Sequence, residues 1–248
     1  MSITKFIDYL AKEEKYSPHT ITAYSKDLNL FSAFCADEFD ESTIDHIDYP
    51  LIRSWIVSLV ESGKSNRTIN RKISVLRSYY NFLLRVEVRD TNPLRKHTPL
   101  KETKKVQLPF TENEVSHLLN GDHFSNDYTG VLINTIIETL YCTGMRRAEL
   151  IQLQSNAVDF AAATLKVIGK RNKERIIPII PSLGEQLKRY RLAVQKKFPL
   201  EQSPFFFCTE KGEKLSENFV YKSVNEYSKK ISTKVKNSRQ VLRQSFTT

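Results

Sequence analysis

Hydrophobic residues in the first 90 positions recur every three to four residues, which is the period of an amphipathic helix. Ser17 followed by Pro18 is a helix start, and a third helix is expected from about Pro50 to Gly63. Ser65 then caps a fourth helix. The side chains expected to face the core of this helical unit are Ile3, Phe6, Ile7 and Leu10; Ile21, Tyr24, Leu28 and Phe31; Ile52, Trp55, Ile56, Leu59 and Val60; and Ile69, Ile73, Leu76, Tyr80 and Leu83.

The second half of the chain mixes helical and strand patterns. Thr111 and Glu114 form a capping box before a short helix, and a longer apolar helix over 128–142 is closed by Gly144. Three runs rich in Val, Ile and Leu predict strands, and the polar tip 169–173 predicts a hairpin between the last two. The strands are expected at 157–160, 165–168 and 175–179, and further helices at 182–196, 216–233 and from 240 onward. The pattern is therefore that of a mainly α protein with a small β-sheet.

Two domains are expected on either side of a polar segment. Residues 90–107 contain two prolines and show no apolar periodicity, which is typical of a linker. We therefore divide the chain into a helical domain over 1–88, a basic linker over 89–107, and a second domain over 108–248.

Composition excludes several classes of protein. The 248 residues are 40% hydrophobic and 27% charged, unlike a disordered or collagen-like chain. No apolar run approaches the ~20 residues of a membrane helix, and the first ten residues include Lys5 and Asp8 rather than the apolar core of a signal peptide. Three widely spaced cysteines, without a C-x-x-C pair, favour a reducing cytoplasmic setting and no structural zinc.

The net charge of +10 is unevenly distributed along the chain. Residues 1–62 hold 5 Lys/Arg and 11 Asp/Glu, whereas residues 63–107 hold 12 and 3. Such a local excess indicates a surface that faces a polyanion, although a solvated face kept for solubility would look the same. On the fourth helix, Arg67 and Arg71 fall opposite the apolar stripe and Lys72 and Arg77 lie at its flanks, with no Glu four residues earlier to pair with them. We expect DNA-phosphate contacts from Arg67, Arg71, Lys72 and Arg77, from the linker residues Lys104 and Lys105, and from the hairpin-tip residues Arg171 and Lys173.

Three basic residues of the second domain are candidates for chemistry. Arg146 lies at a helix start with Glu149 one turn away, Lys170 at the hairpin tip, and Arg243 at the start of the last helix. Two guanidinium groups and a lysine would suit a phosphodiester, since arginine binds phosphate oxygens in pairs and lysine can protonate a leaving oxygen. A surface ion pair remains an equal alternative for each residue taken alone. The sequence has no acidic cluster for a metal and no phosphate-binding G-x-x-x-x-G-K-[ST] loop, so we expect no metal, nucleotide or other cofactor.

These residues stand in motifs that resemble the tyrosine recombinase (phage integrase) family, above all its Xer-like bacterial members. The likeness covers almost the whole chain, in SPHTITAYSKDL, SNRTINRKISVLRSYYNFL, the NP linker, YCTGMRRAELIQL, VIGKRNKERIIPI and VLRQSFTT. It implies a SAM-like four-helix core-binding domain, an α+β catalytic domain, and site-specific DNA recombination through a 3′-phosphotyrosyl intermediate. By the same resemblance Arg146 and Arg243 hold the phosphate and Lys170 protonates the leaving 5′-hydroxyl. The implied partner is double-stranded DNA bound by a homo- or hetero-tetramer in the bacterial cytoplasm at the nucleoid.

The sequence departs from the family pattern in two respects. Gln240 stands at the family's histidine position and Gln244 at a second, and glutamine cannot exchange a proton near neutral pH. No tyrosine follows Tyr227, which precedes the VLR motif and is not at the family's nucleophile position. We therefore expect a catalytic domain that is incomplete at its C-terminus. A fragment, a decayed recombinase that only binds DNA, and a tyrosine supplied by another subunit remain alternatives, and neither the target site nor the choice between chromosome-dimer resolution and mobile-element movement follows from the sequence.

Overall fold

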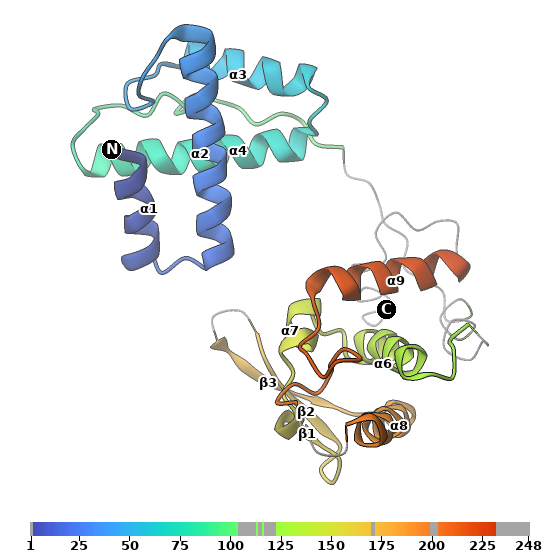
Figure 1. Cartoon of the computed structure of the whole chain (residues 1–248). Helices are drawn as coiled ribbons and strands as arrows, with labels where there is room; N and C mark the ends of the chain where they lie inside the picture. Colours follow the sequence, from blue (N-terminus) through green and yellow to red (C-terminus); the bar gives the residue numbers. More distant parts are fainter. Residues whose placement is uncertain are drawn as a thin grey trace. The chain divides into compact units, whose positions relative to one another are not determined.

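The computed structural model describes residues 2–103, 113, 116, 123–169, 172–198 and 203–231. The chain divides into two compact units, 1–105 and 106–248. Figure 1 shows the elements of both units, and each unit is described by itself.

Unit 1 contains the helices that the periodicity predicts. Their bounds are α1 Ser2–Lys12, α2 Pro18–Phe39, α3 Tyr49–Glu61 and α4 Asn66–Arg85. Both predicted serine caps are confirmed: Ser17 Oγ accepts a hydrogen bond from the Thr20 amide, and Ser65 Oγ accepts one from the Thr68 amide, each at 3.3 Å. The side-chain oxygen in each case satisfies an amide that the first helical turn leaves without a backbone partner.

The core of unit 1 lies where these four helices pack (Figure 1). The predicted stripe of α4 is confirmed, because Ile69, Ile73, Leu76, Tyr80 and Leu83 are all buried. The expectation for the end of α3 is wrong at Val60, whose side chain is 50% exposed. The apolar pattern of α3 is therefore longer than the face that the helix buries.

The segment after α4 packs against unit 1 as far as Thr103. Leu94 is fully buried, and the Asn70 side chain on α4 donates to the Leu100 carbonyl at 2.8 Å while accepting from the Leu100 amide at 2.9 Å. Residues 90–103, which the sequence assigns to a linker, are therefore attached to α4 along their described length. The attachment is made by one buried leucine and by scattered polar contacts, which leave no periodic signal in the sequence.

Unit 2 combines a small sheet with helices that pack beside it (Figure 1). Its elements are α6 Tyr128–Thr143, α7 Arg147–Gln152, the short 3₁₀ helix η1 Ser155–Ala157, β1 Val158–Asp159, β2 Thr164–Ile168, β3 Glu174–Pro178, α8 Pro181–Lys197 and α9 Glu217–Ile231. The three strands are antiparallel in the order β1-β2-β3, as the predicted hairpin requires. Leu165 faces Ile177 and Val167 faces Arg175 across β2 and β3. The predicted helix after Thr111, with its capping box to Glu114, and the predicted helix from residue 240 lie outside the described residues.

The end of α6 is set by Gly144. This residue has φ +57°, and its amide donates to the Leu140 carbonyl at 3.1 Å. A left-handed residue after the last turn is the usual way in which a helix stops, and glycine adopts it without a steric cost. The predicted helix end is confirmed, and the chain re-enters a helix only three residues later. In the part of the chain that the structure describes, no helix has the length and apolar character needed to cross a membrane.

Candidate active site and basic surface

Two of the predicted cations of α4, Arg71 and Lys72, are paired with Asp27, a buried acid of α2. Lys72 Nζ lies 2.6 Å from Asp27 Oδ1, and Arg71 Nη1 lies 2.5 Å from Asp27 Oδ2. The Lys72 side chain, expected at the flank of the helix as a phosphate contact, is only 8% exposed and therefore lies in the interior. The Arg71 side chain is half exposed. Lys72 is held in the interior because a buried cation is tolerated only when an opposite charge and hydrogen bonds accompany it.

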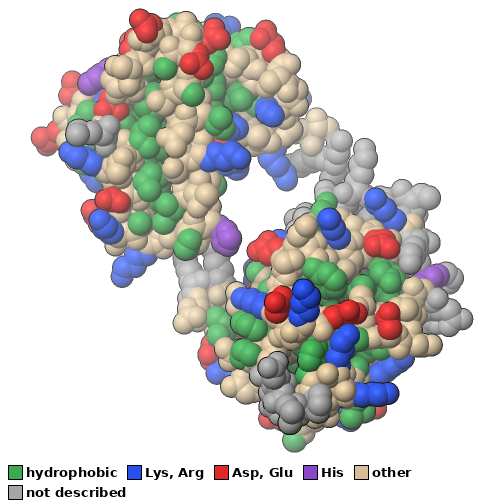
Figure 2. Space-filling model, in the orientation of Figure 1, with side chains coloured by type: hydrophobic (Ala, Val, Ile, Leu, Met, Phe, Trp, Pro, Cys, Tyr) green, Lys and Arg blue, Asp and Glu red, His purple; other side chains and the backbone are tan. Residues whose placement is uncertain are grey.

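Two other predicted contacts on α4 remain at the surface to different degrees. Arg67 is 85% exposed, with its Nε 3.2 Å from Glu102 Oε2. Arg77 is half-buried and donates to the His97 carbonyl at 3.1 Å. Both partners belong to the 90–103 segment, so helix periodicity alone could not identify them. Lys104, Lys105 and Arg171 lie outside the described residues, and Lys173 is exposed. Figure 2 shows Lys, Arg, Asp and Glu side chains interspersed on the visible face of unit 2.

Arg146 is placed by the turn between α6 and α7. It occupies the N-cap position of α7 with extended backbone. Glu149, one turn into the helix, accepts the Arg146 backbone N–H at Oε2 and the Arg146 side chain at Oε1, each at 2.7 Å. The predicted link between these two residues is therefore present, and it satisfies an amide at the helix start. The Arg146 side chain is 49% exposed, so part of its guanidinium group is open to a ligand.

Arg175 on β3 binds the same carboxylate from the other side, a contact that the sequence reasoning missed. Its Nη1 donates to Glu149 Oε1 at 3.0 Å and its Nη2 donates to Oε2 at 2.8 Å. This is the paired arrangement in which arginine binds a carboxylate most strongly. Strand alternation could have pointed to it, because Arg175 shares the face of β3 that carries the buried Ile177 and Ile179.

These donors keep Glu149 ionised in the interior. Burial raises the pKa of the Glu149 carboxyl, but hydrogen bonds from Arg175 and from the backbone and side chain of Arg146 outweigh burial and hold this pKa at about 2. The hydrogen bond to Glu149 in turn raises the pKa of Arg175. The site thus presents a fixed carboxylate that orients two cations.

Gly169, the first residue of the connection between β2 and β3, lies close to this carboxylate. A Cβ placed on Gly169 would be 3.3 Å from Arg175 Nη1 and 3.4 Å from Glu149 Oε1. The Gly169 amide donates to the Lys173 carbonyl at 2.8 Å, which closes the neck of the hairpin. Gly169, which precedes Lys170 in the sequence, therefore lies next to Glu149, which orients Arg146. Lys170 itself, Gln240, Gln244 and Arg243 lie outside the described residues.

A second contact, between Arg147 and Glu217, holds α7 to α9. The Arg147 guanidinium pairs with the Glu217 carboxylate and also donates to the Glu217 carbonyl at 3.2 Å. Glu217 is the first residue of α9, where a negative charge is favourable. The helix that begins beside Arg146 is therefore held to both β3 and α9.

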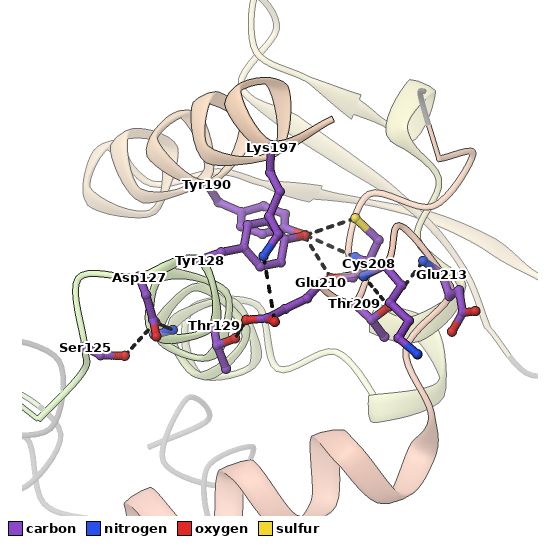
Figure 3. Close-up of polar contacts among 12 residues, drawn as sticks. Ser125, Asp127, Tyr128, Thr129, Tyr190, Lys197, Cys208, Thr209, Glu210 and Glu213 are labelled. Carbon is purple, nitrogen blue, oxygen red and sulfur yellow. Dashed lines mark hydrogen bonds and ion pairs between the residues drawn. The ribbon is translucent and has the colours of Figure 1, made fainter. Parts of the chain in front are cut away.

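Another polar cluster in unit 2 is structural (Figure 3). Tyr128 donates to the Cys208 carbonyl and the Cys208 amide donates to the Tyr190 hydroxyl, each at 3.0 Å. Both tyrosines are buried, and burial raises the pKa of each hydroxyl. Lys197 lies over the Tyr128 ring, with Nζ 4.9 Å from its centre, and 3.7 Å from Glu210. These hydroxyls join α6, α8 and the 208–213 turn, and they are closed to a large substrate.

Within the described ranges, no group of three or more His, Cys, Asp or Glu residues is arranged to hold a metal ion. The three cysteines are free and buried.

The two units and this site define a known class of protein. Residues 3–87 match the profile described as "Phage integrase, N-terminal SAM-like domain" and residues 99–248 match "Phage integrase family", so the chain belongs to the phage integrase family, the tyrosine recombinases. Among curated relatives, the chain is 32% identical over 231 residues to tyrosine recombinase XerC of Pediococcus pentosaceus, which covers 93% of this chain and 72% of the relative. It is 32% identical over 249 residues to tyrosine recombinase XerC of Bacillus licheniformis, which covers 99% of this chain and 81% of the relative.

Solved structures show the same fold at lower identity. A crystal structure of the XerH site-specific recombinase bound to a palindromic difH substrate matches 98% of this chain and 72% of its own chain, with TM-score 0.75 and 18% identity. A lambda integrase(75-356) dimer bound to a COC′ core site matches 99% of this chain and 83% of its own, with TM-score 0.75 and 16% identity. The predicted SAM-like helical domain and α+β recombinase domain are confirmed by these matches.

Proposed function

We propose that the protein recombines DNA at specific sites by cutting and rejoining strands through a 3′-phosphotyrosyl link. The observation that carries the proposal is the position of Arg146. Its side chain is oriented by the buried Glu149 carboxylate, which lies close to Gly169, the residue before Lys170 in the sequence. A half-exposed guanidinium can bind phosphate oxygens and neutralise the charge that develops on them.

The proposed reaction assigns one task to each site residue. A tyrosine oxygen, whose proton is released to water, attacks the phosphorus; the bond to the 5′ oxygen breaks, and Lys170 gives its own proton to that oxygen. Arg146 and Arg243 hold the two remaining phosphate oxygens, and Gln240 donates a hydrogen bond to one of them. The phosphotyrosyl bond retains the energy of the broken bond, so that a partner strand's hydroxyl can reverse the step without a metal or a nucleotide.

The nucleophile is not assigned to a described tyrosine. The Tyr128 and Tyr190 hydroxyls are buried and hydrogen-bonded, and Tyr227 stacks on Phe124 with ring centres 4.6 Å apart. Residues 228–248 contain no tyrosine. We propose that residues 1–248 bind and orient the phosphate, and we do not assign the attacking tyrosine to Tyr128, Tyr190 or Tyr227.

The proposed partner is double-stranded DNA. The XerH and lambda integrase neighbours are described as bound to DNA, the latter as a dimer. For this chain we propose a tetramer on two duplexes in the bacterial cytoplasm, associated with the nucleoid, with a role in chromosome partition as one candidate purpose. Proposed phosphate contacts are Arg67, Arg71 and Arg77 on α4, the 104–105 lysine pair, and Arg171 and Lys173 at the hairpin; the buried Lys72 is omitted.

A trapping experiment tests the reaction. Duplexes retained by residues 1–248 from a randomised pool would be amplified, nicked near their centres, and incubated with this chain and with a version extended by the C-terminal segment of the Bacillus licheniformis relative. We expect a covalent protein–DNA adduct only from the extended version, and none from its Arg146→Ala variant. An extended protein that folds, binds its selected duplex and forms no adduct would refute the enzymatic proposal.

A second candidate function is a DNA-binding protein without catalysis on the same scaffold. Gln240 and Gln244 favour it, because they stand where the family pattern has proton-exchanging histidines. Gln240→His in the extended version separates the two candidates. Adduct formation that appears only with the histidine supports the binder, whereas an adduct without it supports the recombinase.

A further inference from the structure

We propose that Arg175 is a positioning residue: its two-point contact with Glu149 holds the β2–β3 hairpin against the start of α7, where Arg146 lies. This inference rests on the proposed function for its catalytic consequence. Its structural part, the position of the hairpin, stands on the contacts of Arg175 and is tested separately.

The carboxylate of Glu149 is shared evenly between two arginines. Oε1 accepts from the side chains of Arg146 and Arg175 at 2.7 and 3.0 Å, and Oε2 accepts from the Arg146 backbone and the Arg175 side chain at 2.7 and 2.8 Å. The Glu149 side chain is 4% exposed. A planar carboxylate bound on both oxygens by two rigid groups has little freedom to rotate, so a movement of Arg175 is transmitted to Arg146.

Arg175 lies near the start of β3, close to the connection between the two strands. It faces Val167 across the two strands, and beyond this pair only Ile168 and Glu174 are paired before the connection begins. Gly169, the residue that follows β2, lies near the same guanidinium, because a Cβ built on Gly169 would be 3.3 Å from Arg175 Nη1. A side chain at position 169 would therefore crowd the contact between Arg175 and Glu149.

Sequence adjacency extends this geometry to the proposed acid. Lys170 follows Gly169 directly in the sequence and stands between β2 and β3, so the proposed acid belongs to the hairpin whose strand β3 carries Arg175. If Arg175 served only to neutralise Glu149, Arg146 would already provide one cation for that purpose. The two hydrogen bonds of Arg175 also fix the orientation of the Glu149 carboxylate relative to β3, which charge neutralisation alone would not require.

The first measurement is amide hydrogen exchange on residues 1–248 with Arg175→Lys and Arg175→Gln. Lysine keeps the charge but replaces the two-nitrogen fork by a single ammonium group. We expect protection of the Gly169 and Arg146 amides to fall about tenfold or more in both variants, while the amides of α8 keep theirs. The matched control is Lys166→Gln, which removes the exposed Lys166–Glu174 pair from the opposite face of the same hairpin and should leave both amides protected.

The second measurement is the cleavage assay described above, made with the extended protein. We expect Arg175→Lys to lower the rate constant of adduct formation at saturating DNA about tenfold or more, with the dissociation constant for the selected duplex within about twofold of the parent. A role confined to stability would instead lower the active fraction without changing the rate constant of the folded molecules.

The outcomes separate the two proposals. Uniform loss of protection across unit 2, or no loss at Gly169, overturns the positioning role. Selective loss with an unchanged cleavage rate overturns its catalytic part. If the parent protein forms no adduct, the proposed function fails, and hydrogen exchange alone decides whether Arg175 positions the hairpin.

Discussion

Arg175 on β3 and Glu149 on α7, 26 residues apart in the chain, form a two-point contact with N···O distances of 3.0 and 2.8 Å. This contact joins the sheet of unit 2 to the helix that begins beside Arg146. The Glu149 side chain is 4% exposed, whereas the Arg146 and Arg175 side chains are 49% and 38% exposed, so a buried carboxylate fixes two partly solvated cations. Such an arrangement suits a site that must hold cations in place for an incoming anion.

Glu149→Gln should destabilise unit 2 at neutral pH by about 2 kcal/mol. The substitution removes the charge between two arginines, and the cost is below that of a fully buried pair because both arginines are partly solvated. Urea unfolding followed by far-UV circular dichroism measures the change. Trp55 is the single tryptophan and lies in unit 1, so its fluorescence should show an unchanged unit 1.

Low pH should reduce the difference in unfolding free energy between the parent protein and the Glu149→Gln variant. The folded pKa of Glu149 is about 2 against an ordinary value of 4.5, so its stabilising effect is complete above pH 4.5 and is lost as the pH falls toward 2. The effect is at most about 3 kcal/mol, which is the free-energy equivalent of that pKa difference. Unfolding free energies of both proteins at pH 7 and pH 3 test this; a difference that stays constant would show that Glu149 is not held ionised in the fold.

Asp27→Asn should destabilise unit 1 by about 3 kcal/mol. It leaves the buried Lys72 ammonium without its carboxylate, and an unpaired buried charge is among the costliest single changes. Trp55 fluorescence reports the transition directly, because Lys72 Nζ lies 5.9 Å from the centre of its ring. The control is Asp8→Asn, which breaks an exposed pair with Lys12 and should cost less than about 0.5 kcal/mol.

Arg67 and Lys72, two of the predicted cations of α4, should differ in what they contribute to the salt dependence of DNA binding. Arg67→Ala should lower the slope of log affinity against log salt by about one unit, as expected for one lost phosphate contact, without loss of stability. Lys72→Met should leave that slope unchanged, because the side chain is buried. Filter binding or fluorescence anisotropy between low and moderate salt provides the measurement. An equal fall of the slope in both variants would mean that Lys72 reaches the DNA after all.

Gly144→Ala should destabilise unit 2 by about 1 kcal/mol or more. The residue has φ +57°, where a Cβ meets the following carbonyl group. Gly184→Ala is the matched control, because Gly184 lies inside α8 and its Cβ would meet only Ile179 Cγ2 at 3.6 Å. Alanine there should be neutral or stabilising by about 0.5–1 kcal/mol, since it is the better helix former. Thermal unfolding of the two variants compares the effects.

Local patterns predicted the local structure well. Ser17 and Ser65 cap the helices that their sequence context indicates, Gly144 ends α6, and the tip at 169–173 connects the two strands of a hairpin. These features depend on hydrogen bonds and backbone angles within a few residues, which neighbouring sequence is sufficient to determine. The family resemblance, carried by motifs such as that around Arg146, was likewise visible in the sequence.

Contacts between distant segments could not be predicted in this way. The pairing of Lys72 with Asp27, 45 residues away, turned an expected surface cation into a buried one. Asn70 holds residue 100 against α4 although the 90–107 segment has no periodicity of its own. In both cases polar side chains make the contact, and their partners are defined only by how distant segments pack.

The order of amino acids was thus enough to specify the helices, the hairpin, the family and the identity of the candidate cations. Packing in three dimensions then selected which of those cations are open to a phosphate and which are neutralised by acids inside the fold. The reason is that a charge is stabilised or left free by the groups that surround it in space, and Glu149 meets Arg175 only once β3 has packed beside α7.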